Sequence, residues 1–84
     1  MLRVTKATPV HGHVLEVEFN DGSAGQVDCE FLIGHGLGKD LGNPDYFRRV
    51  RVDDELATVV WPNGLDPAPE LLRARLVAEV PSAA

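Results

Sequence analysis

Cysteine is almost absent from this sequence, since Cys29 is the only one among 84 residues. A lone thiol cannot form an internal disulfide, so we expect the fold to be held by packing alone or with the help of a second copy, as in a homodimer. Such sparse cysteine is typical of a reducing compartment. No apolar run approaches the roughly 18–20 residues that span a bilayer, and the first residues do not resemble a signal peptide. We therefore expect a cytoplasmic protein without membrane contacts.

Basic residues are also scarce. Eight lysines and arginines stand against 13 aspartates and glutamates, which gives a formal net charge of −5. A chain with this balance is repelled by phosphate backbones and by anionic membranes, so we do not expect it to bind nucleic acid without a partner. Its length suits one domain and not two. We predict a single α+β domain over residues 1–80 and a frayed tail at 81–84.

Alternating apolar and polar residues predict strands. Leu15, Val17 and Phe19 point to one face of a predicted strand, while Glu16 and Glu18 point to the other. Similar patterns predict strands at 2–9, 13–19, 24–29, 50–53 and 57–61, a short middle helix at 44–49, and a C-terminal helix from Pro69 to about Glu79. We expect an α+β fold in which a largely antiparallel, five-stranded meander sheet carries the two helices and the apolar segment 31–33 on one face.

Two segments rich in turn-forming residues connect these elements. Residues 20–23, Asn-Asp-Gly-Ser, predict a tight hairpin between the second and third strands. Residues 34–42 contain four glycines, which predict a mobile loop. The loop does not match a phosphate-binding motif, because Lys39 is followed by Asp40 where that motif has serine or threonine.

The most distinctive segment is residues 61–70, Trp-Pro-Asn-Gly-Leu-Asp-Pro-Ala-Pro-Glu. Trp61 ends an apolar strand, and the proline after it interrupts the ladder of hydrogen bonds. Asn63 and the following glycine favour a turn with positive φ. Asp66 is placed to accept hydrogen bonds from the first turn of the C-terminal helix. Each unusual residue of the segment therefore has a predicted role in folding.

Three motifs follow one another along the chain: Phe-Asn-Asp-Gly at 19–22, Asn-Pro-x-x-Phe at 43–47, and the segment 61–70. Their order resembles a widespread bacterial family of small domains of unknown function. The resemblance implies an α+β fold and a stand-alone prokaryotic protein. Some relatives carry the domain ahead of a helix-turn-helix DNA-binding domain, which we do not expect here because few residues follow Val80. Others look like partners in toxin–antitoxin-type gene pairs, and the family has no established catalytic residues to carry over.

Several residues are candidates for chemistry. His11 and His13 flank a glycine and could join Cys29 and His35 in a zinc site. These four residues lack the usual metal-ligand spacings, so we predict no metal site. Cys29 could also be a nucleophile, but the parity of its strand points it inward, as expected for an inert thiol. We predict no catalytic residues and no cofactor.

Three arginines, Arg48, Arg49 and Arg51, form a basic patch to which Lys39 could contribute. The patch could contact nucleic acid. The competing interpretation is an edge strand whose charged face discourages unwanted pairing, and we favour it. The sequence leaves this choice open.

A partner-binding surface is the function that we favour. Our candidates for it are Trp61, Asn63, Asp66, Tyr46 and Arg49. The competing interpretation places Trp61 and Phe47 in the core. We predict a non-enzymatic protein-interaction or regulatory domain, an antitoxin-like partner of a small basic protein. The alternative is a small-ligand-binding or enzymatic role centred on Gly34–Gly38. The sequence leaves open the partner's identity, the oligomeric state, and whether Trp61 and Asn63 face the core.

Overall fold

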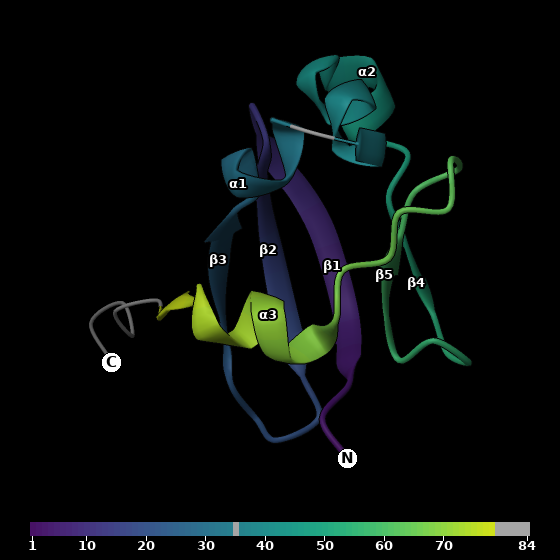
Figure 1. Ribbon diagram of the computed structural model, residues 1–84. Coiled ribbons are helices and arrows are strands. Elements are labelled where there is room, and N and C mark those ends of the chain that lie inside the picture. Colours follow the sequence, from purple (N-terminus) through teal and green to yellow (C-terminus); the bar gives the residue numbers. More distant parts are fainter. Residues whose placement is uncertain (35, 79–84) are drawn as a thin grey trace.

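The computed structural model describes residues 1–34 and 36–78. Its elements are β1 (Val4–His11), β2 (Val14–Phe19), β3 (Ala24–Asp28), α1 (Glu30–Ile33), the 3-10 helix η1 (Gly36–Gly42), α2 (Pro44–Phe47), β4 (Arg51–Asp53), β5 (Thr58–Val60), α3 (Pro69–Ala74) and β6 (Val77–Ala78). They form an α+β fold with antiparallel sheets and short helices, as Figure 1 shows. No helix among the described residues is long and apolar enough to cross a membrane.

The first three strands form the predicted antiparallel meander. The pattern of β2 is confirmed, because Leu15, Val17 and Phe19 are buried while Glu16 and Glu18 are exposed. The hairpin between β2 and β3 closes where Gly22 adopts a φ of 89° and donates its N–H to the Phe19 carbonyl at 3.1 Å. Local turn chemistry therefore sets the register of this sheet.

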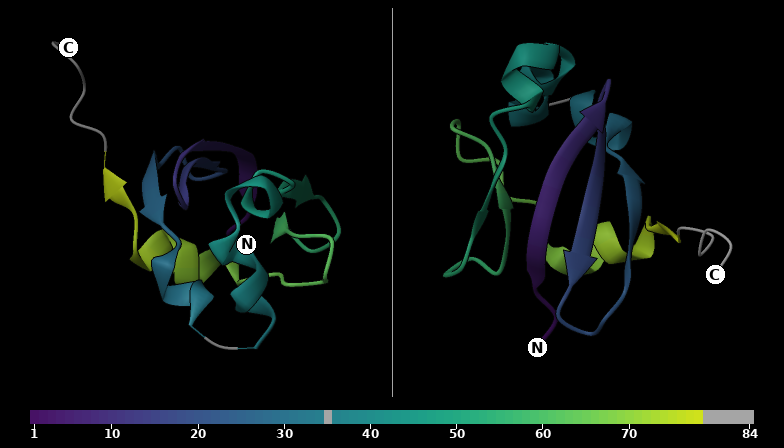
Figure 2. Two further views of the ribbon diagram at one scale, coloured as in Figure 1. Left: turned by 90° about the horizontal axis from the view of Figure 1, so that it is seen from above. Right: turned by 180° about the vertical axis from the view of Figure 1, so that it is seen from behind.

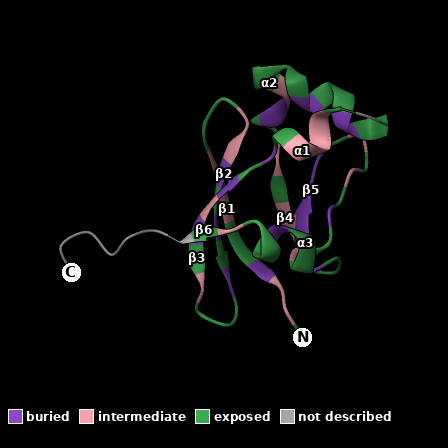
Figure 3. Ribbon diagram, turned by 60° about the vertical axis from the view of Figure 1, so that its left-hand side comes forward, coloured by how far each residue is buried: buried purple, intermediate pink, exposed green. Residues whose placement is uncertain are grey.

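The prediction of one five-stranded meander is wrong. β4 and β5 pair only with each other, as a separate two-stranded sheet, while β6 joins the free edge of β3 to complete a four-stranded sheet. One backbone hydrogen bond, from the Val4 N–H to the Ala57 carbonyl at 2.9 Å, links β1 to the turn before β5. All three residues of β5 are buried, a burial pattern visible in Figure 3. The alternation along a strand identifies its faces but not its neighbour, which is why the division into two sheets escaped prediction.

The C-terminal helix is shorter than predicted. It ends at Ala74, and Val77 and Ala78 form β6 against Gln26 and Gly25. The spacing of the leucines in this region fits a helix, but β3 offers an unpaired edge that the chain takes up as a strand. Glu79, the predicted helix end, lies outside the described residues.

The prediction that Asp66 caps the C-terminal helix is also wrong. Ala68, not Asp66, occupies the N-cap position, and no side chain caps the first turn. Pro69 at the first helical position keeps the preceding residue extended, with Ala68 at φ −59° and ψ 143°. The helix therefore begins two residues after the point that Asp66 could cap, and Asp66 is exposed.

The segment after β3 is helical where the sequence predicted a glycine loop. α1 and η1 occupy it, and Gly38 of η1 is buried. A Cβ atom added at Gly38 would overlap the Leu32 carbonyl oxygen of α1. The glycine is thus needed for close packing of η1 on α1. The middle helix α2 begins as predicted, since the Asn43 side chain accepts a hydrogen bond from the Asp45 N–H at 2.9 Å.

The helices of the described residues lie on one side of the four-stranded sheet. α3 crosses its inner face, and α1, η1 and α2 gather at the end where β3 finishes, as Figure 1 shows. The core between these layers consists of buried apolar residues (Val4, Leu15, Val17, Phe19, Val27, Cys29, Leu41, Phe47, Val59, Trp61 and Leu72). The opposite face of the sheet is turned to the reader in the right-hand view of Figure 2, and no element of residues 1–34 or 36–78 covers it.

Candidate interaction surface

The uncovered face of β1–β2–β3 is a surface whose residues take no part in the core. Strand pairing sets its rows, because residues opposite one another in an antiparallel pair share a face. One row joins Lys6, Glu18 and Ala24, and the next joins Thr8, Glu16 and Gln26. Of these residues only Gln26 is partly buried; the other five are exposed. We call this surface, completed by Asp28 opposite Val14, the outer face.

Carboxylates outnumber the other charged groups on the outer face, where Glu16, Glu18 and Asp28 stand against Lys6. Glu16 and Glu18 lie two residues apart on the central strand, so their Cα atoms are about 7 Å apart and both side chains point outward. Lys6 is the one lysine of these rows, and its Nζ atom is 4.0 Å from Glu18 Oε2. Both side chains of this pair are more than half exposed, so the ion pair leaves Glu18 accessible. A rigid sheet therefore presents negative charge to solvent.

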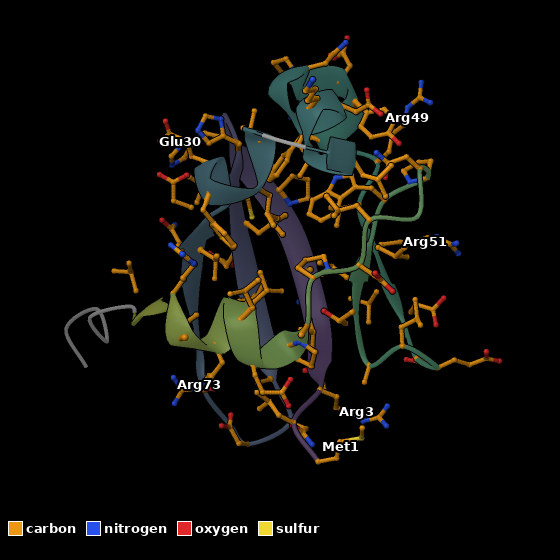
Figure 4. The ribbon with its side chains drawn as sticks, viewed as in Figure 1. Met1, Arg3, Glu30, Arg49, Arg51 and Arg73 are labelled. Carbon is orange, nitrogen blue, oxygen red and sulfur yellow. The ribbon has the colours of Figure 1, made fainter. Side chains whose placement is uncertain are left out.

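A hollow of about 370 Å³ adjoins the Asp28 end of this face. Asp28, Glu30, Phe31 and Arg75 line it, and the Arg75 guanidinium lies over the Phe31 ring at 3.9 Å from its centroid. Figure 4 shows Glu30 at this end of the molecule, beside α1. The lining combines an aromatic ring with charges of both signs.

Trp61 lies in the core and not on a binding surface. It is 1% exposed, its ring centroid is 5.6 Å from that of Phe47, and its Nε1–H donates a hydrogen bond to the Phe47 carbonyl at 2.9 Å. The interpretation that places Trp61 and Phe47 in the core is therefore confirmed. The indole joins the segment 61–70 to α2.

Asn63 connects the same segment to η1. Its Nδ2 atom donates to the Leu37 carbonyl at 2.8 Å and to Asp40 Oδ2 at 3.1 Å, while its Oδ1 accepts the Leu65 N–H at 3.0 Å. Gly64 takes the predicted positive φ, at 91°. The amide of Asn63 is therefore used within the fold.

The remaining partner candidates lie elsewhere. Tyr46 is half-buried against the core, while Asp66 and Arg49 are exposed. Because Trp61 is buried and Asn63 is engaged in the fold, the five predicted residues do not form one exposed surface. A contact of Asp66 or Arg49 with a partner stays a prediction.

The basic patch is separate from the outer face. Arg48, Arg49 and Arg51 are exposed, and none of them lies within 4.0 Å of a carboxylate oxygen in the described residues. Figure 4 shows Arg49 and Arg51 projecting from the side of α2 and β4. Arg51 belongs to a three-residue strand at the edge of its sheet, as the edge-strand interpretation expects.

Cys29 is buried, as its strand parity predicted, at 0% exposure. Burial, with a smaller contribution from the Asp28 charge, raises the pKa of its thiol to about 12. The thiolate that a nucleophile needs is therefore strongly disfavoured at neutral pH.

Among the described residues, the zinc ligands that we considered from the sequence do not form a cluster. Cys29 is sealed in the core, His11 is exposed, and His35 lies outside the described residues. The structure instead places one ligand atom each of His13, Asp28 and Glu30 within 4.8 Å of one another. The hairpin register could have revealed the first two, because His13 precedes Val14, which pairs with Asp28.

Comparison with known proteins adds a family and no function. No curated protein matches the chain, and no solved structure does. A family model described as "Protein of unknown function (DUF2442)" matches residues 4–78, which covers the strands and helices that the structure describes. The chain therefore belongs to the family of proteins of unknown function DUF2442.

Proposed function

We propose that this protein is a non-enzymatic interaction domain that binds a small basic protein through its outer face. The observation that carries the proposal is an exposed sheet face, rich in carboxylates and uncovered by any element of the described chain. Lysine and arginine side chains on a partner would complement Glu16, Glu18 and Asp28 electrostatically.

The charge of the whole chain supports the same partner. A net charge of −5 attracts a basic protein at long range and speeds the encounter. The outer face belongs to a sheet whose other side is packed, so binding there needs little reorganisation of the backbone.

The biological setting is part of the proposal. The motifs that resemble a bacterial family with toxin–antitoxin-type gene pairs support an antitoxin-like role, in the cytoplasm of a prokaryote. An acidic chain that neutralises a basic partner fits this role. A role in regulation then follows from the release or capture of that partner.

The alternative of a ligand site centred on Gly34–Gly38 has less support. Gly38 is buried because η1 packs against α1, which gives this glycine a structural role. The hollow described above is lined by Asp28, Glu30, Phe31 and Arg75, and none of these belongs to that loop.

A pull-down from the native host tests the proposal. The protein and its Glu16→Lys/Glu18→Lys variant are immobilised in parallel, and the captured proteins are identified by mass spectrometry. We expect a small basic protein to be retained by the parent chain and lost from the variant. Recovery of no such protein, or equal recovery by both baits, would contradict the proposal.

A further inference from the structure

Three side chains with metal-ligating atoms meet beside the outer face. His13 lies in the turn between β1 and β2, Asp28 ends β3, and Glu30 begins α1. The backbone holds these segments together, because the Cys29 N–H donates to the His13 carbonyl at 2.8 Å. One ligand atom from each side chain lies within 4.8 Å of the others, although the residues come from three elements or turns.

The separation of His13 from Asp28 fits a metal site as well as an ion pair. His13 Nε2 and Asp28 Oδ1 are 3.6 Å apart, which is longer than an ordinary hydrogen bond of about 2.7–3.2 Å. Two ligands on a tetrahedral ion with bonds near 2.0–2.1 Å are about 3.3 Å apart. A small rotation of the side chains would bring both atoms to this distance.

The backbone orients the Asp28 carboxylate, and the Glu30 side chain is exposed. Asp28 Oδ1 accepts a hydrogen bond from the Glu30 N–H at 3.0 Å. This hydrogen bond holds the carboxylate in one orientation, as hydrogen bonds from neighbouring groups do for metal ligands. Arg75 lines the same hollow, but it lies over Phe31 and makes no ion pair within 4.0 Å with either carboxylate. The hollow gives water access to the remaining coordination positions.

We propose that His13, Asp28 and Glu30 bind a divalent transition-metal ion such as Zn²⁺. One imidazole nitrogen and two carboxylate oxygens are ligands that Zn²⁺ accepts, with water at the fourth position. This set differs from the four ligands considered from sequence, since it shares only His13 with them. It goes beyond the proposed interaction function and does not depend on it.

Titration of the untagged protein with ZnCl₂ by calorimetry tests the site. We expect one Zn²⁺ per chain, and at least about tenfold weaker binding for His13→Ala and for Glu30→Gln. His11→Ala, in the same turn region, and Glu70→Gln, in the first turn of another helix, are the matched controls and should bind as the parent does.

Three results would overturn the proposal. The first is no binding by the parent at about 100 μM Zn²⁺, a concentration far above the dissociation constant expected of a specific site. The second is undiminished binding by both site variants. The third is loss of binding in the His11→Ala variant. Circular dichroism shows whether each variant is folded. If a site variant unfolds, NMR spectra of the parent decide: Zn²⁺ should shift the signals of His13, Asp28 and Glu30, and shifts confined to other histidines would refute the site.

Discussion

Gly38 shows at the scale of one residue why this fold needs glycine. A Cβ atom there would overlap the Leu32 carbonyl oxygen, whereas one at Gly34 meets no atom within 4 Å. We expect Gly38→Ala to lower the free energy of unfolding by about 1–3 kcal/mol, because η1 must move away from α1. Gly34→Ala should change it by less than about 0.5 kcal/mol. Urea unfolding followed by the fluorescence of Trp61 measures both, and equal effects would contradict the packing role of Gly38.

The buried thiol of Cys29 makes a prediction about pH. Burial raises its pKa from an ordinary value of 9.0 to about 12. The unfolded chain therefore releases this proton at a lower pH than the folded chain does. The stability that Cys29 contributes is complete below about pH 9 and is lost as the pH rises from about 9 towards about 12.

The variant Cys29→Ala isolates this effect. We expect the free energy of unfolding to fall less steeply above about pH 9 in the variant than in the parent. Urea titrations at several alkaline pH values measure the two slopes. Identical slopes would show that the thiol titrates alike in the folded and unfolded chains.

Single residues were predictable where strand parity decides their position. The alternation placed Cys29 inward correctly, and it separated Leu15 from Glu16. Asp66 was not predictable in this way, because two prolines follow it and only the second one starts the helix. A capping residue can be recognised from sequence, but the position where the chain turns into the helix depends on tertiary contacts.

At the scale of elements, Asn63 joins the turn of residues 61–65 to η1. Asn63→Asp keeps an oxygen that can accept the Leu65 N–H, but it replaces the Nδ2 donor with an oxygen facing the Leu37 carbonyl and Asp40. We expect this exchange to destabilise the fold by about 1–3 kcal/mol. Asn43→Asp is the matched control, because aspartate caps a helix about as well as asparagine does.

Thermal unfolding near neutral pH compares the two Asn→Asp variants. Asn63→Asp should unfold at a lower temperature than the parent, while Asn43→Asp should stay within about 2–4 °C of it. If the control loses as much stability as Asn63→Asp, the contacts between the turn and η1 do not account for the loss of stability.

Elements that close locally were predictable, and those that depend on distant partners were not. The hairpin of β2 and β3 follows from its turn residues, and α2 follows from Asn43 and the proline after it. β6 was missed because the spacing of Leu72 and Leu76 fits a helix equally well. β6 forms because β3 has a free edge, and this edge exists only in the assembled sheet.

At the scale of the whole molecule, the outer face and the basic patch of Arg48, Arg49 and Arg51 lie on different surfaces. The outer face carries Glu16, Glu18 and Asp28, and the side of α2 and β4 carries exposed arginines. The sequence predicted a small basic partner from net charge, but it assigned the contact to the turn of residues 61–70. The uncovered face depends on the packing of the described helices against one side of the sheet, which no local pattern reveals.

Reversing charge on the outer face should leave the fold intact. Glu16→Lys/Glu18→Lys removes an exposed ion pair with Lys6, and such pairs contribute roughly 0–1 kcal/mol. We expect its melting temperature to stay close to that of Asp54→Lys/Glu55→Lys, a charge-matched pair on the exposed turn between β4 and β5. A much larger loss for the sheet variant would mean that these glutamates serve the fold, and differential scanning fluorimetry decides the point.

The affinity of these two variants for the captured basic partner is the most direct test of the outer face. Isothermal titration calorimetry at fixed salt should show the parent and Asp54→Lys/Glu55→Lys binding within a fewfold of one another. Glu16→Lys/Glu18→Lys should bind at least about 30-fold more weakly, equivalent to about 2 kcal/mol. Equally weakened binding by both variants would mean that net charge alone drives the interaction. An unchanged affinity of Glu16→Lys/Glu18→Lys would contradict the outer face as the binding surface.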